Sequence, residues 1–239
     1  MNSFLLPLIL LLAINAGCKY IFALPSSKRK KSKHQYGRSS LIIPKGEIPT
    51  IVPKLLVFDL DNTLWTPELY QIRKKGQIRA WQDIRLFDGA QKICEDLAMN
   101  ADSLWEPTSF AIASRTDRVE LAHQLLGEFK AGGKRLSEIF SKERTKIFPG
   151  SKIAHFTELS RETGIDLKDM IFFDDDARLN CREIQQMGVL CLHCPRGLSV
   201  DLFRFAINQY DEMKLSRSKW SGKTLTFRDM QKANFRGSR

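Results

Sequence analysis

The chain has 239 residues, of which 43% are hydrophobic, and it carries a formal net charge of +11. This length and apolar content suit one domain of ordinary size with extensions. Residues 1–40 and residues 214–239 each carry +7, so that residues 41–213 carry −3. We therefore expect no specific nucleic-acid binding, because a protein that follows a phosphate backbone has its positive charge on the folded domain.

The N-terminal segment is expected to be a targeting signal and not part of the fold. Residues 1–18 begin with an apolar run that is short for a membrane-spanning helix, which needs about 20 apolar residues. They are predicted to be a signal peptide or, as the alternative, a retained anchor. Residues 19–45 are predicted to be a basic, serine-rich leader or linker, with the composition of an organelle transit peptide. Together, residues 1–18 and residues 19–45 resemble the two-part leader of algae with complex plastids. We expect entry into the secretory pathway, with a plastid as one destination, and transient membrane contact through the leader.

From residue 54 onward, short apolar runs alternate with helical patterns. The predicted strands are residues 54–60, 109–113, 138–140, 146–148, 170–174 and 189–192. The predicted helices are residues 88–99, 117–129, 151–163, 177–187 and 200–213. Residues 66–84 are predicted to be a loop or a short excursion, and residues 214–239 an exposed basic tail. The alternation predicts an α/β fold for residues 46–213: a Rossmann-like open parallel sheet with helices on both faces and no large cap domain.

The five cysteines do not indicate a disulfide framework, because their number is odd and their spacing irregular. Cys191 and Cys194 form a C-x-x-C pattern, which is also found in redox and zinc sites. Such a site would need a second pair of ligands nearby, and none is visible in the sequence. We therefore interpret residues 189–192 as a buried strand, with Cys194 just beyond it.

Polar clusters end three of the predicted strands. Asp59 and Asp61 follow the first, residues 114–116 follow the second, and residues 174–176 end the third. In open parallel sheets, ligands bind at the carboxyl ends of the strands. The sequence therefore predicts one polar site at this edge, outside the apolar core.

These residue types match phosphoryl-transfer chemistry. Asp59 and Asp175 offer hard carboxylate oxygens, without histidine or cysteine, and such ligands favour Mg²⁺. A carboxylate can attack a phosphoryl group, and a second carboxylate two residues along, Asp61, can protonate the leaving oxygen and then activate water. Positive charge around the phosphoryl oxygens would come from Lys152, with Ser114 as a further donor.

The order of these motifs carries a family resemblance. The segments are "VFDLDNTLW" (57–65), "ASRT" (113–116), "FPGSKIAHF" (148–156) and "MIFFDDDARLN" (170–180). They resemble the haloacid dehalogenase (HAD) superfamily of phosphohydrolases and, more narrowly, its magnesium-dependent phosphatase family. The resemblance covers residues 54–195 and implies a HAD-like fold. The segment 66–84 is shorter than this family's insert, which indicates an open site.

The resemblance also implies the role of each acidic residue. Asp59 would be the nucleophile and a metal ligand, and Asp61 the general acid and base, with its backbone carbonyl on the metal. Asp175 would be the third protein ligand of Mg²⁺. Asp174 would orient the site without binding directly.

The phosphate or substrate would contact the backbone of Leu60 and the side chains of Ser114, Arg115 and Lys152. Each of these side chains has a simpler interpretation. Ser114 could cap the next helix, Arg115 could be an ordinary surface arginine, and Lys152 could be a surface lysine at a helix start.

The sequence thus predicts a Mg²⁺-dependent phosphatase that forms an aspartyl-phosphate on Asp59. Its substrates would be phosphate monoesters, such as phosphotyrosine-like groups or sugar phosphates, on a small molecule or a protein. One alternative is a phosphotransferase or phosphomutase of the same superfamily, although no domain is present to shield the intermediate from water. The other is a non-catalytic phosphate-binding domain, which would have little reason to keep the full set of Asp59, Asp61, Lys152 and Asp175.

Overall fold

A computed structural model describes residues 39–216 and 221–237 of the chain. The predicted signal peptide and most of the predicted leader lie outside these residues. No helix within the described ranges is both long enough and apolar enough to cross a membrane.

The centre of the fold is a six-stranded sheet in which every pair of neighbouring strands is parallel. In spatial order its strands are β10 (Lys223–Leu225), β9 (Leu190–His193), β8 (Met170–Asp174), β1 (Leu55–Phe58), β4 (Ser109–Ser114) and β7 (Thr145–Ile147). Strand β1 therefore lies between β8 and β4, with Leu55 beside Met170 on one side and Ser109 on the other. This register brings the carboxyl ends of β8, β1 and β4 together, as the sequence predicted.

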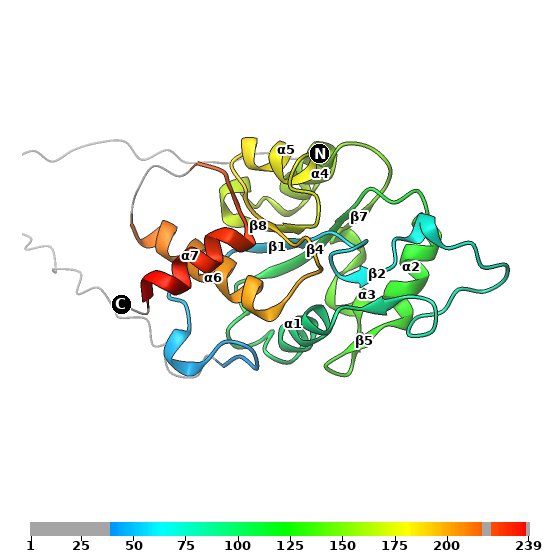
Figure 1. The fold of residues 1–239 in the computed structure, drawn as a ribbon, viewed down its shortest axis with the longest axis horizontal. Helices are drawn as coiled ribbons and strands as arrows, with labels where there is room; N and C mark the ends of the chain where they lie inside the picture. Colours follow the sequence, from blue (N-terminus) through cyan, green and yellow to red (C-terminus); the bar gives the residue numbers. More distant parts are fainter. Residues whose placement is uncertain (1–38, 217–220, 238–239) are drawn as a thin grey trace, which may run out of the picture. The chain divides into compact units, whose positions relative to one another are not determined.

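Helices cover both faces of the sheet (Figure 1). They are α1 (Asp88–Met99), α2 (Val119–Glu128), α3 (Leu136–Ile139), α4 (Lys152–Thr163), α5 (Asn180–Gln186), α6 (Val200–Leu215) and α7 (Phe227–Gly237). Successive side chains of a strand point to opposite faces, and in β1 both faces are apolar. Leu55 and Val57 pack with α4 and α5, whereas Leu56 and Phe58 pack in the larger cluster with α1 and α6. The predicted α/β architecture is confirmed.

Most predicted elements are present, but the strand predicted at residues 138–140 is wrong. Those residues belong mainly to helix α3, in which Leu136 and Ile139 are buried three positions apart. The side chain of Glu138 accepts a hydrogen bond of 2.7 Å from the backbone N–H of Arg135, which fixes the first turn of this helix. A two-stranded hairpin, β5 (Lys130–Ala131) and β6 (Lys134–Arg135), precedes this helix and turns at Gly132 and Gly133.

The insert at residues 66–84 forms no cap domain. It begins at β2 (Trp65–Thr66), which pairs with β3 (Arg85–Leu86), and contains one 3-10 turn at Leu69–Gln71. Its exposed Trp81 packs edge-on against Phe129 at 5.0 Å between ring centroids, so the insert lies against the domain. The predicted short excursion is confirmed.

The predicted cysteine strand is confirmed, because Cys191 lies in β9 and Cys194 follows it. Both side chains are fully buried, and the thiols are free, like those of Cys94 and Cys181. The residues that the structure describes contain no cluster of three or more metal-binding side chains here or elsewhere.

The expected domain start at residue 46 is too late. Ile42 and Ile43 are 5% and 3% exposed and belong to the main core. The side chain of Ser40 donates to the buried carboxylate of Asp96 over 2.9 Å. Residues 39–45 are therefore part of the folded body and not of a linker.

The prediction of an exposed tail after residue 213 is also wrong for the described residues. Helix α6 continues to Leu215, β10 adds a strand beside β9, and α7 follows. Gly222 permits this close approach, because a Cβ atom there would lie 1.7 Å from the carbonyl oxygen of Gln185. Leu225 is fully buried and Met230 is 8% exposed, so the segment contributes to the core.

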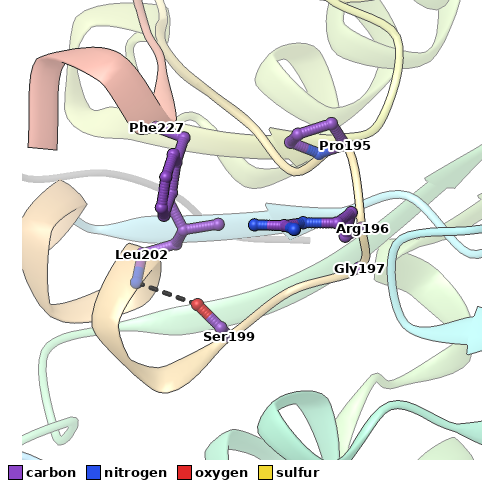
Figure 2. A pocket seen from close by; sticks show the side chains of 6 residues that line it. All are labelled: Pro195, Arg196, Gly197, Ser199, Leu202 and Phe227. Carbon is purple, nitrogen blue, oxygen red and sulfur yellow. Dashed lines mark hydrogen bonds between the residues drawn. The ribbon is translucent and has the colours of Figure 1, made fainter. Parts of the chain in front are cut away.

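Helix α7 also completes a pocket of about 380 Å³ beside the loop that follows β9 (Figure 2). Its lining residues are Pro195, Arg196, Gly197, Ser199, Leu202 and Phe227. The guanidinium of Arg196 lies 5.6 Å from the ring centroid of Phe227, which ties the loop to the C-terminal helix.

We predict that ending the chain at Ser216 will lower the free energy of unfolding by roughly 3–6 kcal/mol, from the lost burial of side chains such as Leu225 and Met230. It will also expose the edge of β9, an aggregation risk. Urea unfolding of both chains measures the loss. A control chain that ends at Gly237 keeps β10 and α7 and should match the full chain. An unchanged midpoint for the shorter chain would mean that this segment contributes nothing to stability.

Candidate active site

Asp59 lies where β1 leaves the core. All four residues of β1 are fully buried, and the backbone N–H of Asp59 still donates to the carbonyl of Phe173 over 3.0 Å. The Asp59 side chain is 6% exposed, at the edge where β8 and β4 also end. A carboxylate in such a position needs a partner, because burial without one disfavours its charge.

That partner is Lys152, in the first turn of α4. Its side chain is fully buried, and its Nζ lies 2.5 Å from Oδ1 of Asp59 and 3.4 Å from Oδ2 of Asp174. A third bond goes to the backbone carbonyl of Ala113. The three N–H groups of the ammonium thus face three protein acceptors, and the interpretation of Lys152 as a surface lysine is wrong.

The pKa values of this group follow from burial and charge. Burial raises the pKa of Asp59 to about 6, against the opposing effect of Lys152. Burial likewise raises the pKa of Asp174 to about 7. For Lys152, burial lowers the pKa, but the charges of Asp59 and Asp174 outweigh it and keep the pKa above its usual value. Lys152 is therefore a permanent buried cation between two carboxyl groups.

Asp61 is held by the turn after β1. The carbonyl of Leu60 accepts the backbone N–H groups of Thr63, Leu64 and Trp65, and this turn presents Asp61 at the edge of the sheet. The indole Nε1 of Trp65 donates to Oδ1 of Asp61 over 2.6 Å. Burial raises the pKa of Asp61 to about 6, and the Trp65 hydrogen bond opposes this shift.

The three consecutive aspartates at the end of β8 have different surroundings. Asp174 is fully buried, and its Oδ1 accepts from the backbone N–H of Asp176 over 2.7 Å and from Nδ2 of Asn180 over 3.1 Å. Asp176 accepts from two backbone N–H groups of the following turn. Asp175 is half-buried, and burial, followed by the charge of Asp174, raises its pKa to about 7.

The end of β4 supplies Ser114, and the loop that follows supplies Arg115. Ser114 is 1% exposed, and it does not cap α2, which begins at Val119. Arg115 is exposed, and its guanidinium donates to Oδ1 of Asn180 over 3.1 Å. Since Asn180 also holds Asp174, Arg115 is linked to the loop after β8. Sequence reasoning did not single out Asn180, although it stands in the quoted segment "MIFFDDDARLN".

The donor set fits a magnesium ion. Asp59 and Asp175 directly follow the adjacent strands β1 and β8, and after burial the charge of Asp175 contributes to the raised pKa of Asp59. A cation there would favour the charged forms of both carboxyl groups. Within the described residues, no three acidic, histidine or cysteine side chains are arranged to hold a metal. Two carboxylates with the backbone carbonyl of Asp61 suffice for Mg²⁺, which keeps several waters and uses one or two carboxylates.

Comparison with known proteins places the chain among phosphatases. The sequence pattern of the acid phosphatase family matches residues 51–213. The chain is 38% identical over 159 residues to the human protein called magnesium-dependent phosphatase 1, covering 62% of this chain and 82% of the relative. It is 30% identical over 169 residues to a HAD-like hydrolase superfamily protein of Schizosaccharomyces pombe, covering 65% and 94%.

A solved structure, a haloacid dehalogenase-like family hydrolase from Xanthomonas campestris, superposes with a TM-score of 0.48 at 11% identity. The match covers 70% of this chain and 99% of that one.

Proposed function

The chain belongs to the acid phosphatase family of the HAD superfamily, and from this premise we propose that it hydrolyses phosphate monoesters with Mg²⁺ through an aspartyl-phosphate on Asp59. The observation that carries the proposal is the buried contact between Asp59 and Lys152 at 2.5 Å, with Asp175 directly after the adjacent strand β8. A nucleophilic carboxylate, a fixed cation and a second carboxylate then meet at one edge of the sheet.

In the first step, Asp59 acts as nucleophile. Its Oδ1 is held by Lys152, which leaves Oδ2 to form a bond to phosphorus. The bond from phosphorus to the leaving oxygen breaks, and its electron pair goes to that oxygen. Asp61, whose pKa burial raises to about 6, carries more protonated carboxyl group than an exposed aspartate would, and it gives its proton to the leaving oxygen.

In the second step, Asp61 acts as a base. It takes a proton from a water molecule as the water oxygen bonds to phosphorus. The bond between phosphorus and Asp59 Oδ2 breaks, and its electron pair returns to the carboxylate. The net reaction converts one monoester and one water into an alcohol and inorganic phosphate.

The carboxylates of Asp59 and Asp175 and the backbone carbonyl of Asp61 would hold the magnesium ion. When bound, it offsets the repulsion between these carboxylates and the negatively charged phosphoryl group. Arg115, Ser114 and the backbone of Leu60 would bind the phosphate oxygens. Lys152 would act indirectly, because its ammonium group holds the carboxyl groups of Asp59 and Asp174.

The absence of a cap domain favours bulky substrates. The insert at residues 66–84 has only short strands and a 3-10 turn, so it leaves room for a phosphate on a protein side chain. We propose aryl phosphates, with phosphotyrosine as the protein-borne example, ahead of sugar phosphates. The insert also carries an exposed aromatic side chain, Tyr70, and an aromatic ring can stack on an aryl leaving group.

We predict that the full chain will hydrolyse p-nitrophenyl phosphate in the presence of Mg²⁺, and that EDTA will reduce turnover by at least about a hundredfold. Added Mg²⁺ in excess of the EDTA should restore the rate. Release of p-nitrophenol measures both. A rate that is the same with EDTA would contradict the metal requirement, and a folded chain that binds Mg²⁺ without turnover would favour the phosphate-binding alternative. Transfer of phosphate to an added alcohol in place of water would favour the phosphotransferase.

A further inference from the structure

Trp65 makes a contact with Asp61 that has no role in the reaction as proposed above. Its indole Nε1 donates to Oδ1 of Asp61 over 2.6 Å, from a side chain with no exposed area. Tryptophan is usually buried with its N–H satisfied by any nearby acceptor. Here the acceptor is the side chain that would exchange the proton with the leaving group.

The indole is held in place from several sides. Its ring stacks on Phe129 at 5.9 Å between centroids, and Phe129 packs in turn against Trp81 of the insert. The backbone of Trp65 pairs with Leu86 in the β2–β3 ladder, and its N–H donates to the carbonyl of Leu60. The indole therefore cannot follow Asp61 if the carboxyl group rotates.

The chemistry of the indole suits a fixed support. Its N–H is a donor only and does not take up a proton at ordinary pH, so it cannot replace Asp61 as acid or base. A donor on Oδ1 disfavours a proton on that oxygen, so the transferable proton would be on Oδ2. The backbone N–H of Leu69 also donates to this carboxyl group and helps to hold it. The orientation of the Asp61 carboxyl group matters as well as its presence, because a proton is transferred only between atoms within hydrogen-bond distance.

We propose that Trp65 is a positioning residue, which fixes the Asp61 carboxyl group so that Oδ2 faces the leaving oxygen of the substrate. The insert at residues 66–84 would then support the acid through Phe129 and Trp65, in place of covering the site. The inference rests on the proposed role of Asp61, and its test separates the two.

The test is the dependence of kcat/KM on the leaving group. Phenolate from phenyl phosphate is a poorer leaving group than p-nitrophenolate and needs the proton of Asp61 more. The readout is the ratio of kcat/KM for p-nitrophenyl phosphate to that for phenyl phosphate. Because both substrates are measured on the same preparation, this ratio does not depend on the fraction of folded enzyme.

Trp65→Phe keeps an aromatic ring and removes the donor. We expect the ratio to rise about tenfold, which is part of the roughly hundredfold or more that a positioned general acid contributes. Trp105→Phe is the matched control, since the fully buried Trp105 donates to the buried Asp96 over 2.8 Å, and no assigned site residue takes part. It should lower stability to a similar degree and leave the ratio at the wild-type value.

Asp61→Asn sets the reference for complete loss of the acid. If it raises the ratio and Trp65→Phe does not, Trp65 has only a packing role and the inference is wrong. If Asp61→Asn itself leaves the ratio unchanged, the proposed role of Asp61 fails. A rise in the ratio with Trp105→Phe would show that general loosening, and not the lost donor, changes leaving-group dependence.

Discussion

Replacing Asp59 by asparagine should reduce hydrolysis of p-nitrophenyl phosphate by about a thousandfold or more while the fold persists. The amide has almost the shape of the carboxylate, so the cavity at the end of β1 stays filled. It offers no nucleophilic oxygen, however, and thus no covalent intermediate can form. The amide oxygen can still accept the hydrogen bond from Lys152, which keeps this buried cation partnered.

Steady-state turnover with Mg²⁺ and the thermal midpoint of unfolding test this prediction together. Asp176→Asn is the matched control in the same cluster, because Asp176 accepts only backbone N–H groups of its own turn and asparagine can do the same. It should stay within about threefold of wild type. Acid-quenched wild-type enzyme should also carry phosphate on the peptide that contains Asp59. Asp59→Asn activity above a hundredth of wild type would refute the nucleophile assignment.

The sequence predicted the central part of the fold well. There the hydrophobic periodicity and the glycines that end helices indicate the same elements. Residues 152–163 form a helix that ends at Gly164, whose φ of 67° is readily adopted by glycine. The apolar run at residues 170–174 is the fully buried strand that it resembled. In these segments, the local pattern and the tertiary packing favour the same structure.

The C-terminal segment could not be predicted in the same way. Among the side chains that the structure describes in this segment, Leu225 and Met230 are the buried ones, which is too few to produce a hydrophobic period in a basic, polar stretch. Strand β10 has three residues and exists because β9 offers an unpaired edge, a contact decided by tertiary structure. Similarly, residues 138–140 contain enough apolar residues to resemble a strand, but Leu136 and Ile139 bury the same side of a helix.

For the site, too, the sequence predicted one part and not another. The sequence indicated that Asp59, Asp61, Asp175 and Lys152 belong to one edge of the sheet, because each stands at the end of a strand or the start of a helix. It did not indicate which of them touch. Lys152 and Asp59 are 93 residues apart, and only the folded structure shows that the two side chains are in contact. Trp65 and Asp61 are only four residues apart, but the sequence does not indicate that the indole donates to this carboxyl group.

Lys152→Met should lower turnover by about a thousandfold and also destabilise the protein. Methionine is similar in length but has neither charge nor donors. Asp59 and Asp174 would then face each other without a cation in a buried site, and Oδ1 of Asp59 would lose the bond that fixes its orientation. Removal of one partner from a buried ion pair typically costs about 3–5 kcal/mol. Turnover and urea unfolding, both compared with wild type, measure the two effects.

Lys214→Met is the control, because Lys214 pairs with Asp169 over 2.6 Å away from the site. It should leave turnover within about twofold of wild type. The double variant Asp59→Asn with Lys152→Met distinguishes a lost ion pair from lost packing. If uncompensated charge destabilises Lys152→Met, removal of the Asp59 charge should restore part of the stability, so that the two losses add to less than their sum. Strictly additive losses would mean that the 2.5 Å contact contributes no coupling and that Lys152 acts mainly by filling space.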